Sequence, residues 1–289
     1  MHQRFYLLMS SILFAPLAMA IDLIPLWDFS NPQLSEQRFR TELAKSTGDD
    51  VLILTTQIAR TYGLRKDFSR AQAILTEVEP KIASAGAEAR ARFALESGRT
   101  LASATHPPET QTDATKADAR ARFGSALSIA REAKLDALAI DAIHMLAFVD
   151  TAPADQRKWA QAALAVVDAS DQAAAKKWEA SVRNNLGYAL HQLGQYDEAL
   201  AQFKLALAIR ERGTNAVATR TAHWMIAWTL RALKRSDEAL AIQLQLEREG
   251  EVANQPDPYV FEELEILYRE KGDSDRAAHY ALLRKAPPK

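Results

Sequence analysis

The sequence predicts an all-α protein, and three observations lead to this fold class. Glycine and proline are scarce, at 10 and 11 of 289 residues, whereas alanine, which has the highest helix propensity, is abundant. Apolar residues make up 48% of the chain, which is sufficient for a buried core. Between residues 181 and 212, apolar residues recur at three- and four-residue spacing in two successive runs, as in a pair of amphipathic helices.

The stretch 181–212 predicts two helices that pack closely against each other. Gly194 separates the two apolar runs and provides the turn, because glycine tolerates the positive φ that ends many helices. Gly187 in the first run and Ala199 in the second are small, so the two helix backbones can approach each other there. Phe203 then fills the space beyond this contact.

The same stretch resembles the tetratricopeptide repeat (TPR) motif in seven residues at the signature spacings of the family. They are Leu186, Gly187, Gly194, Tyr196, Ala199, Phe203 and Ala206. Six second-helix alanines mark successive repeats, namely Ala71, Ala119, Ala160, Ala199, Ala239 and Ala277. Their spacings of 48, 41, 39, 40 and 38 residues exceed the family period of about 34, so we expect longer repeats, as in kinesin light chain. The resemblance implies a TPR-type right-handed superhelix (α-solenoid) of about five to six antiparallel helix pairs.

Residues 1–20 predict a secretory signal peptide. Arg4 gives a positively charged start, an apolar run follows, and Ala18-Met19-Ala20 fits the small-x-small rule for cleavage after Ala20. An uncleaved amino-terminal anchor is the alternative, although the apolar run is short for a complete membrane span. We therefore expect an exported protein in a bacterial periplasm or cell envelope, and one that does not span the membrane after cleavage.

A capping helix is expected directly before the repeats. Ser30 or Asn31 can cap a helix over Pro32–Lys45, because proline is tolerated in the first helical turn. Trp27 and Phe29 are expected to cover the exposed end of the array, since the terminal repeats of a solenoid need capping.

The mature chain is thus predicted to have two parts. Residues 21–48 form the extended arm and capping helix, and residues 49–286 form the repeat array. A polar insertion near residues 104–115 interrupts the second repeat and predicts a flexible loop.

The candidate site is the concave groove that the first helices of TPR pairs line in family members. The resemblance places eight side chains on this groove: Arg99, Phe148, Asn184, Tyr188, His191, Trp224, Trp228 and Arg231. Tryptophan and arginine dominate binding hot spots, so we expect aromatic anchors to bind a protein or peptide while arginines orient a polar or acidic segment. Trp224 and Trp228 have a second interpretation, in which they pack in the core between helices.

Composition excludes several classes of function. The chain contains no cysteine, which excludes disulfides, thiolate zinc sites and cysteine nucleophiles. Its formal net charge of −1 gives no indication of a nucleic-acid partner or a membrane-surface partner. No phosphate-binding loop is present, and we expect no cofactor.

Two other functions stay open as alternatives. An enzyme or metal site could use His144, His191 and His223, which fall in successive repeats and could present three imidazoles to zinc. The chain lacks the HExxH and GxSxG patterns, so we expect no catalysis, and a hydrolase or metal-binding protein is less favoured. A self-associating envelope protein, possible as a homodimer, is the other alternative.

Overall fold

The computed structural model describes residues 21–285, and the predicted signal peptide lies outside the described residues. Within this part the regular structure is entirely helical, which confirms the all-α prediction. The first half contains η1 (Ile24–Leu26), α1 (Pro32–Leu43), α2 (Asp49–Leu64), α3 (Phe68–Ile82), α4 (Ala87–Arg99), η2 (Pro108–Thr110), α5 (Asp113–Glu132), α6 (Asp136–Val149) and α7 (Pro153–Ala169). The second half contains α8 (Ala173–Lys176), α9 (Glu179–Gln192), α10 (Tyr196–Arg210), α11 (Ala216–Ala232), α12 (Ser236–Val252), α13 (Pro258–Glu270) and α14 (Ser274–Lys285).

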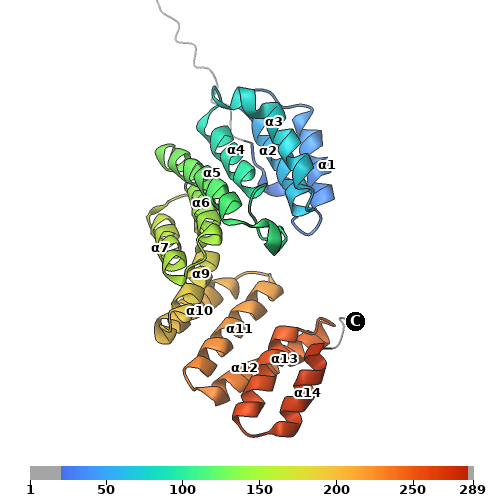
Figure 1. Ribbon diagram of the computed structural model, residues 1–289, viewed down its shortest axis with the longest axis vertical. Helices are drawn as coiled ribbons and strands as arrows, with labels where there is room; N and C mark the ends of the chain where they lie inside the picture. Colours follow the sequence, from blue (N-terminus) through green and yellow to red (C-terminus); the bar gives the residue numbers. More distant parts are fainter. Residues whose placement is uncertain (1–20, 286–289) are drawn as a thin grey trace, which may run out of the picture.

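The helices stack as pairs along a curved array. The pairs are α2/α3, α4/α5, α6/α7, α9/α10, α11/α12 and α13/α14. The first helices of neighbouring pairs also contact each other, as α2 with α4, α4 with α6, α9 with α11, and α11 with α13. We call α2, α4, α6, α9, α11 and α13 the first-helix layer. Figure 1 shows the array as an arc, in which α1–α5 form one arm and α11–α14 the other.

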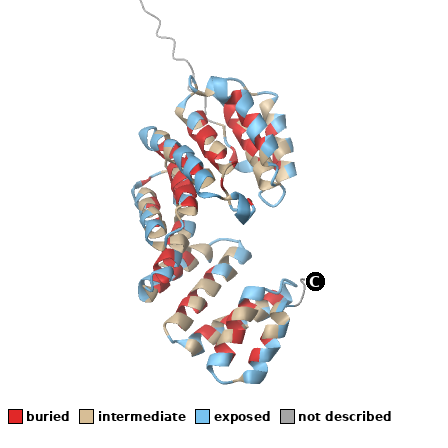
Figure 2. Ribbon diagram, in the orientation of Figure 1, coloured by how far each residue is buried: buried red, intermediate tan, exposed pale blue. Residues whose placement is uncertain are grey.

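The apolar core is connected across several pairs. Partly buried residues join three of its clusters in sequence: Leu164 of α7 packs against the first and second of them, and Leu240 and Ile242 of α12 pack against the second and third. Figure 2 shows the buried residues in the contacts between helices along the whole arc. No single pair buries its apolar face alone, which is the property that defines a solenoid.

Glycine allows the closest helix contact in two of the pairs. A Cβ atom added to Gly187 of α9 would lie 2.7 Å from the Phe203 ring of α10. The same arrangement recurs in α4/α5, where a Cβ atom on Gly98 would lie 2.4 Å from the Phe123 ring. Both phenylalanines are completely buried. The close approach of the two helices that the sequence predicts at Gly187 is therefore confirmed, and the Phe203 ring makes the contact there.

Substitution of Gly187 by alanine tests this contact. We expect the free energy of unfolding to fall by about 1–3 kcal/mol, because the added methyl group overpacks the space against the Phe203 ring. Gly124→Ala in α5 is the matched control, since nothing lies within 4 Å of the added Cβ and alanine favours the helix by about 0.5–1 kcal/mol. Urea unfolding followed by circular dichroism measures both. Equal changes in the free energy of unfolding for the two substitutions would show that the added methyl group at position 187 does not clash with Phe203.

Four pairs share one turn geometry between their helices. The second residue after the first helix has positive φ in each case, at 66° for Lys66, 75° for Gly194, 61° for Lys234 and 77° for Gly272. The backbone follows the same path whether glycine or lysine is present. In two pairs, therefore, a lysine adopts the left-handed conformation that glycine occupies in the other two.

Replacing these lysines by glycine is expected to stabilise the protein. Lys66→Gly and Lys234→Gly should each raise the free energy of unfolding by about 0.5–1 kcal/mol. A side chain at positive φ costs about 1–2 kcal/mol, and the greater backbone entropy that glycine loses on folding, about 0.5–1 kcal/mol, offsets part of this gain. The two sites are distant, so their effects should add in the double variant. Thermal unfolding provides the measurement, and a lower midpoint in either single variant would show that the lysine is not strained.

The amino-terminal arm packs on α1 and α2. Trp27 stacks on Phe29 with ring centroids 4.6 Å apart and meets Phe39 of α1 edge-on at 4.9 Å. The guanidinium of Arg60 of α2 lies 5.4 Å from the Trp27 ring and 5.5 Å from the Phe29 ring. Asn31 caps α1 through its side chain. The arm is thus fixed to the first two long helices.

The polar insertion is also packed. His106 stacks on Phe68 at the start of α3 with ring centroids 3.6 Å apart, and it is only 8% exposed. Thr105 donates a hydrogen bond of 3.2 Å to the carbonyl oxygen of Gly63. The segment near 104–115, for which the sequence predicts a flexible loop, is therefore anchored to α2 and α3, and α5 begins within it.

Candidate binding surface on the first helices

Aromatic side chains of α9, α11 and α13 form one continuous row on the first-helix layer. We call this row the aromatic surface, and it consists of Tyr188, His191, Trp224, Trp228 and Tyr259. The Trp228 ring stacks between Tyr188 at 6.0 Å and Trp224 at 5.7 Å. Trp224 meets Tyr259 edge-on at 6.3 Å. Trp224 and Trp228 share a face of α11 because they are four residues apart.

The aromatic surface is partly open to solvent. Tyr188 is 37% exposed and Tyr259 is 66% exposed, whereas Trp224 and Trp228 are intermediate. Trp224 also packs against the buried cluster at the carboxyl-terminal end of the array. The two interpretations of the tryptophans are therefore compatible, since the indoles support the core and lie in a surface row, while the two tyrosines supply its most accessible area.

His191 is buried within this row. Its ring stacks on Trp228 with centroids 3.3 Å apart and meets Tyr196 of α10 edge-on at 4.9 Å. Burial lowers the pKa of His191 to about 4, and the nearby charge of Arg231 contributes. Neither ring nitrogen has a hydrogen-bond partner among the residues that the structure describes. His191 is therefore a neutral packing group at neutral pH.

Arg231 forms an ion pair within the protein. Its Nε and Nη2 atoms donate hydrogen bonds of 2.8 Å each to the two carboxylate oxygens of Glu263 of α13. The Glu263 side chain is only 4% exposed. The hydrogen bonds with this carboxylate raise the pKa of Arg231. Arg231 thus connects α11 to α13, and two of its donors are already used.

The remaining predicted residues are divided between two places. Phe148 of α6 lines a cavity of about 170 Å³ together with Tyr188, next to the aromatic surface. Asn184 of α9 has a buried amide oxygen without a hydrogen-bond partner among residues 21–285. Arg99 of α4 lines a second cavity, between α2, α4 and α6, and Phe148 lines that cavity as well. The prediction did not include Tyr259, because its contact with Trp224 joins residues 35 apart in different repeats.

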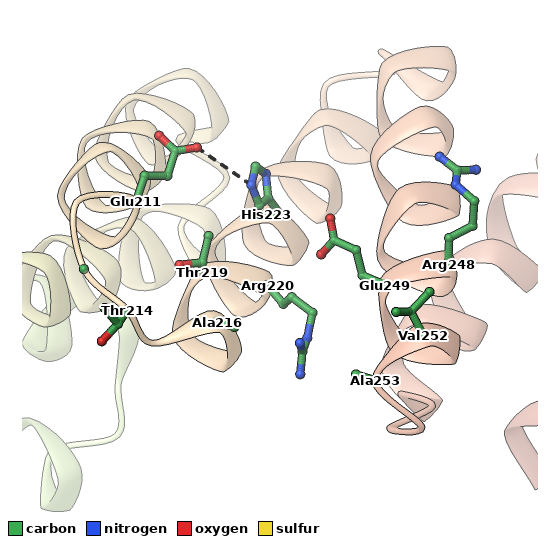
Figure 3. Close-up of a pocket in the computed structure, with 11 residues that line it drawn as sticks. Glu211, Thr214, Ala216, Thr219, Arg220, His223, Arg248, Glu249, Val252 and Ala253 are labelled. Carbon is green, nitrogen blue, oxygen red and sulfur yellow. Dashed lines mark ion pairs between the residues drawn. The ribbon is translucent and has the colours of Figure 1, made fainter.

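The three candidate zinc histidines do not form a cluster. His144 of α6 is hydrogen-bonded to Asn185 at 3.2 Å, and His191 is buried in the aromatic surface. His223 instead faces Glu211, 4.0 Å away, across a wide cleft that Figure 3 shows. Among the described residues there is no group of three or more His, Cys, Asp or Glu side chains that could hold a metal ion.

The cleft of Figure 3 has a volume of about 640 Å³ and lies between the α10–α11 loop, α11 and α12. Acidic and basic side chains both line the cleft, namely Glu211, Glu249, Arg220 and Arg248. No side chains converge on one point there, so the cleft does not constitute a recognisable site. In the part of the chain that the structure describes, no helix has both the length and the apolar character needed to cross a bilayer.

A family model described as tetratricopeptide repeat matches residues 178–247, which carry four of the five residues of the aromatic surface. This part of the chain consists of tetratricopeptide repeats (TPRs). The match spans the pairs α9/α10 and α11/α12. A search of curated protein sequences found no match to this chain.

Solved structures share the fold of this chain at low sequence identity. The apo form of RapI superposes with a TM-score of 0.68 at 14% identity, over 91% of this chain and 74% of RapI. A Signal Transduction ATPase with Numerous Domains protein from Pyrococcus horikoshii, which has a tetratricopeptide repeat sensor, gives a TM-score of 0.66 at 12% identity. That comparison covers 88% of this chain but only 39% of the archaeal protein.

Proposed function

We propose that this protein is a non-catalytic TPR scaffold that binds a peptide or a segment of another protein at the aromatic surface. The observation that carries the proposal is the stacked row in which the exposed Tyr188 and Tyr259 flank two tryptophans on three successive first helices. Tyrosine and tryptophan are enriched in binding hot spots. Stacking already orders these rings, so a partner that covers them loses little additional side-chain entropy.

The environment of the polar residues supports binding over catalysis. His191 is buried and neutral at neutral pH, and two donors of Arg231 are engaged by Glu263. Neither group is placed to act on a substrate as a general acid or base. In this proposal Arg231 orients the helices that carry the aromatic rings, and it does not contact the partner directly.

A comparative pull-down tests the proposal. We expect the Tyr188→Ala, Tyr259→Ala double variant to retain at least tenfold less partner than the wild type from a cell-envelope extract, since hot-spot truncations cost about 2 kcal/mol or more. The variant should stay folded with a slightly lower unfolding temperature, because it loses two ring contacts that are each worth about 0.5–1.5 kcal/mol. Mass spectrometry identifies the retained protein.

The matched control removes exposed apolar side chains from second helices. Leu205 of α10 is 46% exposed and Leu282 of α14 is 72% exposed, so Leu205→Ala, Leu282→Ala should leave retention unchanged. Equal retention by all three proteins would place the partner elsewhere. Recovery of the bait alone, at twice its monomer mass, would favour the self-associating alternative.

We further propose that the protein functions after export, in a periplasm or cell envelope. The support is the arrangement of Arg4, the apolar run and Ala18-Met19-Ala20 at the amino terminus. Amino-terminal sequencing of the protein from a bacterial host with a cell envelope should start at Ile21. A chain that starts at Met1 in the membrane fraction would indicate an uncleaved anchor.

A further inference from the structure

A second cavity, of about 270 Å³, lies on the first-helix layer, and it shares His144 and Phe148 with the smaller cavity next to the aromatic surface. Side chains of α2, α4 and α6 line it, and the insertion between α4 and α5 closes one side through Ser103, Ala104 and Thr105. The insertion is fixed by the stacking of His106 on Phe68. The wall that the insertion adds is therefore an ordered part of the cavity.

Four charged side chains line this cavity, and Arg99 is hydrogen-bonded to two of the others. Arg99 donates hydrogen bonds to Glu96, at 2.6 Å, and to Asp141 of α6. Burial acts to raise the pKa of Asp141, but the charges of Arg99 and Arg60 outweigh it and hold that pKa below its ordinary value. Burial lowers the pKa of His144, which is neutral at neutral pH. Two guanidinium groups and two carboxylates thus leave the cavity without net charge.

Arg60 is the member of this group without a hydrogen bond. Its nearest carboxylate oxygen, Oε1 of Glu96, is 3.8 Å away, beyond hydrogen-bond length. The Arg60 side chain is 24% exposed, and no acceptor for its N–H groups is present among the described residues. Oε2 of Glu96 is likewise without a donor, although the Glu96 side chain is only 3% exposed. Arg60 and Glu96 both line the cavity, so its lining includes one donor group and one acceptor oxygen that no group of the described residues satisfies.

The free donor of Arg60 and the free acceptor of Glu96 indicate which chemical group the cavity can bind. A carboxylate would add a third negative charge next to Glu96 and Asp141, and an ammonium group would meet two arginines. A carboxamide is neutral and carries both an acceptor for Arg60 and a donor for Glu96. Met145, Phe148 and Trp178 also line the cavity and can contact the apolar carbon chain of the ligand.

We propose that the α2–α4–α6 cavity binds a carboxamide group attached to a short apolar chain, with Arg60 and Glu96 as its two hydrogen-bond partners. The carboxamide could belong to a glutamine or asparagine side chain of a bound segment, or to a free small amide. The first source rests on the proposed function, whereas the second does not.

Methionine methyl signals in the NMR spectrum of the full chain test this inference. Only Met145 and Met225 lie in the described part of the chain, the former in the cavity and the latter on α11, which carries part of the aromatic surface. Loss of a signal in Met145→Leu assigns the cavity reporter. The probes are 3-methylbutanamide, 3-methylbutanoate and 3-methylbutylammonium, which share one carbon skeleton. Two blocked pentapeptides, Ala-Leu-Gln-Leu-Ala and Ala-Leu-Glu-Leu-Ala, complete the set.

We expect the amide, the glutamine peptide or both to shift the Met145 signal saturably. Their dissociation constants should be at least tenfold lower than those of the charged probes. Arg60→Gln should weaken that binding at least fivefold, whereas Arg70→Gln on the outside of α3 should not. A response to the peptide alone would identify a side chain as the source, and an equal response to the free amide would identify a small molecule. Equal binding of the carboxylate, no saturable shift with any probe, or full binding to Arg60→Gln would overturn the proposal. A shift of the Met225 signal alone would indicate that the probe binds near the aromatic surface and not in the cavity. This result would also overturn the proposal.

Discussion

Replacing Arg99 by methionine is expected to lower the free energy of unfolding by about 3–5 kcal/mol, because it leaves two buried carboxylates without their shared partner. Arg99 lies between Glu96 and Asp141, and all three side chains are at most 13% exposed. Burial acts to lower the pKa of Arg99, but the two carboxylates outweigh it and raise that pKa, so the arginine is firmly charged. Urea unfolding at pH 7 gives the measurement.

The triple variant Arg99→Met, Glu96→Gln, Asp141→Asn is the control for the loss of Arg99. It removes all three charges, so most of the lost stability should return. In Arg99→Met alone, the destabilisation should decrease as the pH falls toward 4, because the orphaned carboxyls then bind protons. A loss below about 1 kcal/mol at pH 7 would show that water, and not Arg99, solvates the two carboxylates.

Acidification is expected to remove about 3 kcal/mol of stability through His191 alone. Above pH 6.5, the ordinary pKa of histidine, the ring is neutral in both the folded and the unfolded chain. Between this value and the folded pKa of about 4, only the unfolded chain binds the proton, so stability falls as the pH decreases across this window. Each unit of difference between the folded and unfolded pKa corresponds to about 1.4 kcal/mol. The difference between 6.5 and about 4 therefore gives a loss of about 3 kcal/mol in the free energy of unfolding.

His191→Phe should remove this pH dependence while it keeps an aromatic ring between Trp228 and Tyr196. The free energy of unfolding of the variant and the wild type, measured at pH 7.5 and pH 4, gives the comparison. The carboxylates titrate in both proteins, so their contribution cancels. Parallel profiles for the two proteins would mean that His191 can take up a proton in the folded state without cost.

Contacts between residues close in the chain were the most predictable part of this protein. The close approach at Gly187 lies between the two helices of one hairpin, so residue size and spacing were sufficient to predict it. The resemblance to the TPR motif was also sufficient to place Tyr188, Trp224 and Trp228 on first helices, where the structure has them.

Contacts between different repeats were not predictable from local patterns. Arg231 is paired with Glu263, 32 residues later in the chain, and spacing within one helix contains no information about that partner. His106 lies in a polar stretch, yet it is buried because Phe68 of an earlier repeat offers a ring to stack on. The short helix α8 and Trp178, which fill the space next to α6, also lacked a sequence signal.

Site-specific photo-cross-linking is the most direct test of the claim that the aromatic surface binds a partner. A benzophenone amino acid would replace Tyr188 or Tyr259 on the aromatic surface, or Leu205 or Leu282 on the second helices, in cells that produce the full chain. We predict that one protein cross-links at least fivefold more at positions 188 and 259 than at 205 and 282. Equal capture at all four positions, or stronger capture at 205 and 282, would contradict binding at the aromatic surface.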